Sequence, residues 1–419
     1  MIGLAVLGAV FIAYSLVAAR LERWSITAPM VFVLVGAVIG PHGAGILDIA
    51  SNTEAVKVVV ELTLAILLFA DASTLRWSRV RLDATLPLRL LLIGFPLTVL
   101  AGTLVAGLLG PEIGWAAAAL VGTILAPTDA ALGLGVFSDR SVPGRIRRAL
   151  NVESGLNDGL ATPLVTLFLA ILVAEVGAGP TDWLAEAATE LGVAVVVAMV
   201  VGAGVGRLVA AARRRGWTSE TSDRLAVLAT ALLAYAGSVA AGGNGFVAAF
   251  GAGLLFAAAS RGALTEATSF TEDIGLLMSF LVWALFGALL VVPLLTEPIH
   301  PVAVVYAVVS LTVVRMAPVA LALIGSGLRP SSVAFMGWFG PRGLASVVFT
   351  LLAFETLEGG DIAPEWLVEV ATWTILLSIL AHGVTARPLA AWYGRTIADG
   401  VAEHYSPSET PELASPRQL

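Results

Sequence analysis

The stretch Ala149–Leu164, ALNVESGLNDGLATPL, places Glu153, Ser154, Asn157 and Asp158 inside a long apolar segment. A charged side chain at the centre of a bilayer costs at least ~2.5–3.5 kcal/mol on insertion scales. Two carboxylates in such a segment therefore indicate a functional site.

The composition is that of a polytopic, all-α membrane protein. Of the 419 residues, 58% are hydrophobic and 13% are charged, whereas soluble domains carry about 25% charged residues. The apolar runs are about 20 residues long, which favours helices over the ~10-residue strands of a barrel. The first run has no basic region before it and no cleavage site, so it is expected to be a span rather than a signal peptide.

Several function classes are excluded or disfavoured by what the sequence lacks. Cysteine is absent, so neither a disulfide framework nor a thiolate metal site is possible. No Walker loop or dinucleotide fingerprint is present, so we expect no ATP drive and no cofactor. The run Arg213–Arg215 is read as membrane topology rather than as a nucleic-acid patch.

Thirteen apolar segments follow one another along the chain, and a polar tail (396–419) that we expect to be disordered comes after them. The segments are 3–19, 27–40, 54–71, 86–109, 115–136, 147–176, 183–210, 225–240, 245–259, 274–295, 302–324, 331–354 and 366–386.

Charge supports this division. Alternate turns and the tail contain all but three of the 23 Lys and Arg residues, and the intervening turns contain none. The positive-inside rule therefore predicts an amino terminus outside, a carboxyl terminus inside and an odd number of spans. The three exceptions are Lys57, Arg315 and Arg342. Lys57 lies four residues before Glu61 on one helix face, so we expect these two to pair.

Polar groups from three segments converge on one depth. With a rise of ~1.5 Å per residue, Asp158 and Arg342 each lie about 16 Å from the cytoplasmic end of their segment, and Asp129 lies about 12 Å in. Because the hydrocarbon core is ~30 Å thick, these groups are expected near its midplane.

Two of these segments carry helix breakers. Pro127 interrupts the fifth, and Gly340, Pro341 and Gly343 interrupt the twelfth around Arg342. The breaks fall an odd number of spans apart, so the two helices run in opposite directions. Paired interruptions in two inverted halves, here spans four to six and eleven to thirteen, are typical of a secondary transporter with a midplane site.

The polar groups suit a hard cation. Ser154 and Asp158 share one face of the sixth segment, and Glu153 and Asn157 form the adjacent pair. A break at Pro127 would free backbone carbonyls, which adds to the oxygen ligands that such a cation prefers. Burial favours the protonated form of a carboxylate and a bound cation favours the ionised form. One site would then bind Na⁺ or H⁺ in competition.

Three motifs resemble the monovalent cation:proton antiporter superfamily: Ala-Pro-Thr-Asp at 126–129, Glu-Ser-Gly-Leu-Asn-Asp at 153–158 and Gly-Pro-Arg-Gly at 340–343. The Asn157–Asp158 pair resembles its Asn-Asp branch, the NhaP-type sodium/proton exchangers. The resemblance implies electroneutral exchange of one Na⁺ for one H⁺ and a homodimer. It also implies scaffold helices in 1–75, a linker helix and further scaffold helices in 183–295, and a moving core in 86–176 and 302–390.

The resemblance also implies individual roles. Asp158 would carry the cation or the proton, and the Ser154 hydroxyl and the Thr128 carbonyl would ligate Na⁺. Asn157 would tie the sixth span to the unwound fifth near Thr128. Asp129 would neutralise helix ends or ligate the ion directly.

Other roles concern ion pairs and the third span. Glu153 would pair with a core arginine, by preference Arg342, and Arg315 would support Glu153 or a helix end. Pro341 departs from the leucine usual before that arginine. The third span commonly carries an acid near the site, for which Asp71 is preferred over Glu61. His382 is expected to be incidental.

The predicted function is a secondary active antiporter that exchanges Na⁺ for H⁺ in a cell membrane and serves pH homeostasis. The alternatives are a K⁺/H⁺ antiporter of the same fold and an intramembrane aspartyl enzyme with Asp129 and Asp158 as its dyad. A sodium-coupled solute symporter would need uncommitted polar residues around a solute cavity, and few are present. A channel would need a carbonyl filter, and none is recognisable.

Overall fold

The structure is a computed structural model that describes residues 2–46, 53–74, 84–129, 132, 141–176, 183–357 and 365–401. Within these ranges the chain is helical and has no strand. Eight helices of the described chain are long and apolar enough to cross a membrane, and three shorter helices are also apolar.

Each of the thirteen apolar segments contains at least one helix. In chain order the helices are α1 (Ile2–Arg23), α2 (Ala28–Ile39), α3 (Thr53–Thr74), α5 (Thr85–Arg89), η2 (Leu90–Gly94), α6 (Phe95–Leu109), η3 (Pro111–Ile113), α7 (Gly114–Ile124), α9 (Gly144–Val176), α10 (Trp183–Val197), η5 (Ala198–Ala203), α11 (Gly204–Arg214), α12 (Glu220–Ala240), α13 (Gly245–Ser260), α14 (Thr265–Phe286), η6 (Gly287–Val291), α15 (Val292–Thr296), α16 (Pro301–Leu311), α17 (Val313–Ala322), α18 (Pro330–Trp338), α19 (Leu344–Leu357) and α20 (Glu365–Val401).

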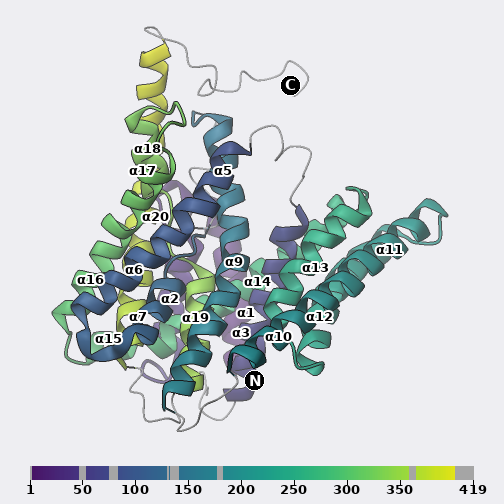
Figure 1. Cartoon of the computed structure of the whole chain (residues 1–419), viewed down its shortest axis with the longest axis horizontal. Helices are drawn as coiled ribbons and strands as arrows, with labels where there is room; N and C mark the ends of the chain where they lie inside the picture. Colours follow the sequence, from purple (N-terminus) through teal and green to yellow (C-terminus); the bar gives the residue numbers. More distant parts are fainter. Residues whose placement is uncertain are drawn as a thin grey trace.

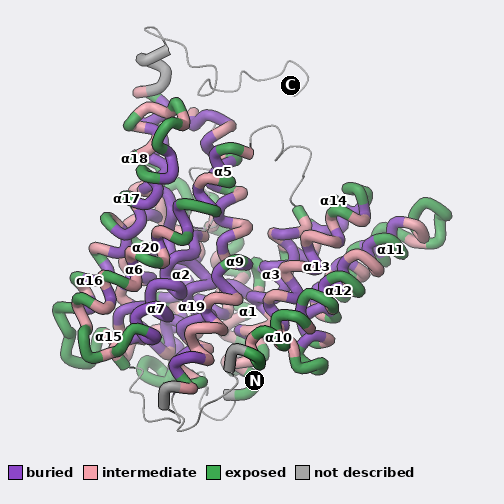
Figure 2. The backbone as a smooth tube through the Cα atoms, viewed as in Figure 1, coloured by how far each residue is buried: buried purple, intermediate pink, exposed green. Residues whose placement is uncertain are grey.

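Two groups of helices flank α9. Figure 1 shows α10 to α14 on one side of the molecule and α16, α17, α18 and α20 on the other, with α9 and α19 near the middle. In Figure 2 the buried residues gather along the central helices and the exposed ones along the outer faces and turns. Helices α7, α3 and α13 all pack against α9, so the segment that carries Asp158 lies in the interior.

Glycines allow backbone contact between α2 and the α14–η6 segment. A Cβ built on Gly36 would lie 1.8 Å from the carbonyl oxygen of Ala284, and one on Gly287 would lie 2.0 Å from that of Val33. Small residues let helices approach this closely when packing rather than hydrophobic burial must hold them together.

Three of the apolar segments are broken within the described chain. The predicted breaks occur after α7, where Leu125–Asp129 is not helical, and between α18 and α19. A third break at Thr312 separates α16 from α17 (φ −108°, ψ −87°). No proline or glycine marks it, so helix-breaker residues did not predict it. The far half of the fifth segment lies outside the described residues, apart from Leu132.

The last helix is longer than its apolar pattern. The predicted tail begins at residue 396, but α20 continues to Val401. The hydropathy limit underestimated this helix because an amphipathic or exposed turn can prolong a helix beyond its apolar stretch. Residues 402–419 lie outside the described part of the chain.

Gly36→Ala should destabilise the protein, because the new methyl group would collide with the Ala284 carbonyl. A backbone group, unlike a side chain, cannot change rotamer to avoid the collision. Overpacking of this kind costs ~1–3 kcal/mol. Gly237→Ala is the matched control on α12, since a Cβ there meets nothing within 4 Å. Thermal unfolding of the detergent-solubilised variants measures both. Equal unfolding temperatures would contradict the close approach of α2 and α14.

Candidate functional site

A cavity of about 150 Å³ lies where α3, α9, α14 and the start of α19 meet the non-helical segment after α7. Its polar lining residues are Asp71, Thr74, Thr128, Asp129, Asn151, Ser154, Asp158 and Ser279. The cavity therefore brings together five of the six predicted cation-site residues, and no basic side chain lines it within the described chain.

Helix α9 presents one polar face to this cavity. Asn151, Ser154, Gly155 and Asp158 all line it, at the spacing that places residues on one side of a helix. Ser154 is buried, whereas Asp158 is half-buried because its carboxylate borders the open volume. Gly155 lies beside Asp71, and a Cβ built on it would make ordinary van der Waals contact with the Cβ of that residue, at 3.7 Å.

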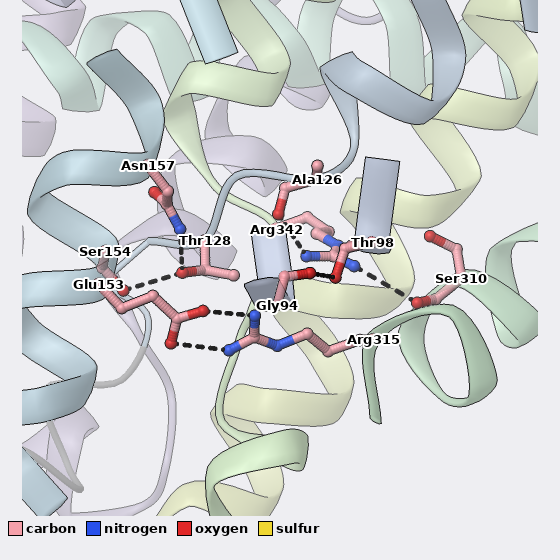
Figure 3. Close-up of polar contacts among 10 residues, drawn as sticks. All are labelled: Gly94, Thr98, Ala126, Thr128, Glu153, Ser154, Asn157, Ser310, Arg315 and Arg342. Carbon is pink, nitrogen blue, oxygen red and sulfur yellow. Dashed lines mark hydrogen bonds and ion pairs between the residues drawn. The ribbon is translucent and has the colours of Figure 1, made fainter. Parts of the chain in front are cut away.

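Thr128 is fixed to α9 by two side chains. The amide nitrogen of Asn157 donates to the Thr128 hydroxyl over 2.8 Å, and the hydroxyls of Thr128 and Ser154 are 3.0 Å apart (Figure 3). This is the contact between the sixth and fifth segments that the resemblance implies for Asn157. The amide oxygen of Asn157 is buried and has no hydrogen-bond partner among the residues that the structure describes.

Asp129 lies at the start of α19. Its carboxylate accepts the backbone N–H of Leu344 over 3.0 Å, and its own N–H donates to the Pro341 carbonyl over 2.8 Å. Gly343 is required beside it, because a Cβ there would lie 2.0 Å from the Asp129 Cβ. Of the two roles predicted for Asp129, neutralisation of a helix end thus has a visible contact.

The preferred partner of Glu153, Arg342, is wrong, whereas the expected support of Glu153 by Arg315 is observed. Glu153 pairs with Arg315 rather than Arg342, through two parallel hydrogen bonds of 2.5 and 3.0 Å (Figure 3). Both side chains are almost fully buried, at 1% and 2% exposure. The unpredicted break at Thr312 lies three residues before Arg315, and α17 begins at Val313. The position of the Arg315 side chain could therefore not be predicted from an unbroken helix.

Arg342 binds carbonyl groups instead. Its guanidinium donates to Ala126, beyond the end of α7, over 2.9 Å and to Ser310, near the end of α16, over 3.4 Å. Its side chain is fully buried. A cation is stabilised beside the carbonyl end of a helix, and here one arginine serves two such ends.

The third segment contributes Asp71, as preferred, and not Glu61. Asp71 lines the cavity, whereas Glu61 accepts a hydrogen bond from the Tyr235 hydroxyl over 2.8 Å. The expected pairing of Glu61 with Lys57 is also wrong, because Lys57 forms an ion pair with Glu355 at 2.8 Å. A long-range partner on α19 replaces the local one, which helix spacing alone does not reveal.

Sequence reasoning missed four polar or aromatic lining residues and one buried histidine. Asn151 had a readable signal, since it continues the face of Ser154 and Asp158, and Thr74 had a similar one, since it follows the predicted Asp71 by three residues on α3. Ser279 and Trp283 had none, because they come from α14, in which the sequence indicated no site residue. The lining residues are Asn151, Thr74, Ser279 and Trp283, and the histidine is His382, which is 1% exposed and hydrogen-bonded rather than incidental.

A family model described as "Sodium/hydrogen exchanger, transmembrane" matches residues 6–392. The chain belongs to this exchanger family. It is 27% identical over 373 residues to the K(+)/H(+) antiporter NhaP of Alkalimonas amylolytica, covering 87% of this chain and 62% of that protein. It is 25% identical to the K(+)/H(+) antiporter NhaP2 of a Shewanella strain, covering 91% and 64%. The chain thus spans about three fifths of the length of these curated relatives.

The exchanger fold is also shared with a solved structure. The sodium proton antiporter MjNhaP1 from Methanocaldococcus jannaschii superposes with a TM-score of 0.78 at 24% identity, and the match covers 94% of this chain and 99% of that one. This likeness supports the fold. The family is one of exchangers, so membership in it argues against the intramembrane aspartyl enzyme that the sequence left open.

Glu153→Gln should destabilise the protein by ~3–5 kcal/mol, because it leaves the Arg315 charge buried without its partner. The control is Lys57→Gln, which breaks an ion pair that is about one-third exposed and should cost at most ~1 kcal/mol. Denaturant or thermal unfolding compares them. The double variant Glu153→Leu/Arg315→Met should recover much of the loss. Equal effects of the two single variants would contradict the buried pairing.

Proposed function

We propose that this chain exchanges a monovalent cation for H⁺ by alternating access, with both ligands competing for Asp158. The observation that carries the proposal is the cavity that Asp71, Asp158, Ser154 and Thr128 line together. The relatives' names support cation/proton exchange.

Competition follows from the charge balance of the cavity. Asp129 is compensated by the amino-terminal end of α19, and Glu153 by Arg315. Asp71 and Asp158 remain, with no basic side chain among the described lining residues. Ionised carboxylates in such a place need a counter-charge. A metal cation or a proton supplies it, and each displaces the other because both act on the same oxygens.

Asp158, Ser154 and Thr128 are the proposed Na⁺ ligands, through the carboxylate, the hydroxyl and the backbone carbonyl. The Asn157 amide holds Thr128 against α9, so it would position the ligands and not bind H⁺. Asp71 borders the same volume and would add a second carboxylate. All of these are hard oxygen donors, which suit an alkali cation.

Na⁺ is the first candidate and K⁺ the second. The structural relative is named a sodium proton antiporter, whereas two sequence relatives are named K(+)/H(+) antiporters. The two ions differ in size rather than in preferred ligand type, so ligand spacing within the cavity decides between them.

The transport cycle would use thirteen spans in a plasma membrane, with the amino terminus outside and the carboxyl terminus inside. The breaks after α7 and between α18 and α19 meet, as expected for crossing helices of two inverted halves. We further propose that spans one to three and eight to ten form the dimer scaffold, that span seven links, and that the remaining spans move as the core.

Asp158→Asn should abolish exchange, because an amide neither binds a proton in competition nor neutralises a cation. Proteoliposomes with a pH jump and external Na⁺, K⁺ or Li⁺ in turn provide the measurement. Asp273→Asn, at an exposed carboxylate on α14, is the control and should exchange like the wild type. Robust exchange by a correctly folded Asp158→Asn variant would contradict the proposed mechanism.

Exchange of Na⁺ for H⁺ should be electroneutral, because Asn157 stands in place of the first aspartate of an Asp-Asp pair and Asp158 is the one carboxylate proposed to exchange its proton for the cation. The initial rate of Na⁺-driven pH change should therefore stay the same when valinomycin and a K⁺ gradient impose a membrane potential of either sign. A protein-free liposome corrects for leak. A rate that follows the imposed potential would show that net charge moves and would contradict the inference from the Asn-Asp pair.

A further inference from the structure

Helix α20 presents three polar side chains to the break between α18 and α19. Ser378, His382 and Thr385 are spaced four and three residues apart, so they form one stripe on the helix. Ser378 and His382 are at most 1% exposed. This stripe lies on the thirteenth segment, away from the cavity lining, and the exchange mechanism above does not use it.

The stripe binds the backbone on both sides of the break. On the α19 side, the Ser378 hydroxyl oxygen accepts the N–H of Arg342 over 2.7 Å. On the α18 side, Nε2 of His382 lies 2.8 Å from the Trp338 carbonyl. The Trp338 indole N–H donates to Thr385 over 3.0 Å, and its ring stacks on the imidazole with centroids 4.9 Å apart.

His382 has a backbone carbonyl beside each ring nitrogen. Nε2 lies 2.8 Å from the Trp338 carbonyl, whereas Nδ1 lies 2.9 Å from the Ser378 carbonyl and 3.3 Å from the Ser378 hydroxyl. Because a carbonyl only accepts, a proton on Nδ1 is held within α20, and only a proton on Nε2 connects α20 to α18. The Nε2 contact is therefore the one by which His382 can fix the break.

The break also positions the Arg342 side chain and the first N–H groups of α19, both of which contact residues near the cation site. Arg342 binds the carbonyls of Ala126 and Ser310, and the first turn of α19 supplies the N–H that Asp129 accepts. Asp129 and Leu344 both line the cavity. A shift of the backbone between Trp338 and Leu344 would therefore reach the cavity wall.

We propose that His382 and Ser378 are positioning residues for the cation site, which they serve by fixing the break between α18 and α19. This inference rests on the proposed exchange function. Neither residue lines the cavity proposed to hold the ion. Replacing a residue that orients the ligands without contacting the ion typically changes ion affinity by about 10- to 100-fold.

Two amide substitutions separate this role from simple packing. In His382→Gln the amide nitrogen reaches the position of Nε2 and can still donate to Trp338. In His382→Asn it reaches only the position of Nδ1, so the donation is lost. Thr374→Val is the matched control on α20, because the buried Thr374 hydroxyl bonds only within its own helix, to Val370.

His382→Asn should raise the apparent KM for Na⁺ about tenfold while the maximal rate changes less than about twofold. His382→Gln should restore the wild-type KM, and Thr374→Val should keep it. Hydrogen exchange of the peptide over 339–347 should accelerate in His382→Asn alone. This second measurement needs no transport.

The two proposals fail in different ways. Wild-type proteoliposomes that exchange no monovalent cation would overturn the proposed function, and hydrogen exchange would still decide whether His382 fixes the break. The positioning role is overturned if His382→Asn matches Thr374→Val in KM and in hydrogen exchange. It is also overturned if His382→Gln is impaired as strongly as His382→Asn.

Discussion

A backbone that leaves the helical ladder inside an apolar protein must find other hydrogen-bond partners, since each unsatisfied group costs several kcal/mol there. This chain leaves the ladder after α7, at Thr312 and between α18 and α19. The interruptions satisfy one another. Arg342 donates to carbonyls beside the first two, while Asp129 accepts from the start of α19 and donates back to Pro341.

The same constraint divides the charges of the site into two kinds. Arg342 and Asp129 are compensated by backbone groups at buried helix ends, and Glu153 is compensated by Arg315. These groups hold the framework. The carboxylates of Asp71 and Asp158 have no such compensation among the described lining residues. Two carboxylates without a fixed counter-charge are what a site needs if it is to bind and release a small cation.

The sequence predicted the elements better than their partners. Apolar runs located a helix in every one of the thirteen segments, because hydropathy is a local property. The shared face of Ser154 and Asp158 and the break at Pro127 were readable for the same reason. The partner of Glu153 was not, since it depends on where a break without proline or glycine turns Arg315. His382 was expected to be incidental because its partner is the Trp338 carbonyl. That carbonyl is free to accept from another helix because α18 ends at Trp338.

The close helix contacts have a mechanical consequence. Where α2 meets α14 through Gly36, and α13 meets α3 through Gly253, backbone lies against backbone. Side chains can change rotamer to absorb a displacement, but peptide groups in contact cannot. This part of the molecule is therefore a stiff frame, and deformation concentrates where longer side chains and cavities separate the helices. One such place is a second cavity of about 580 Å³, which Lys57 of α3 and Glu355 of α19 border.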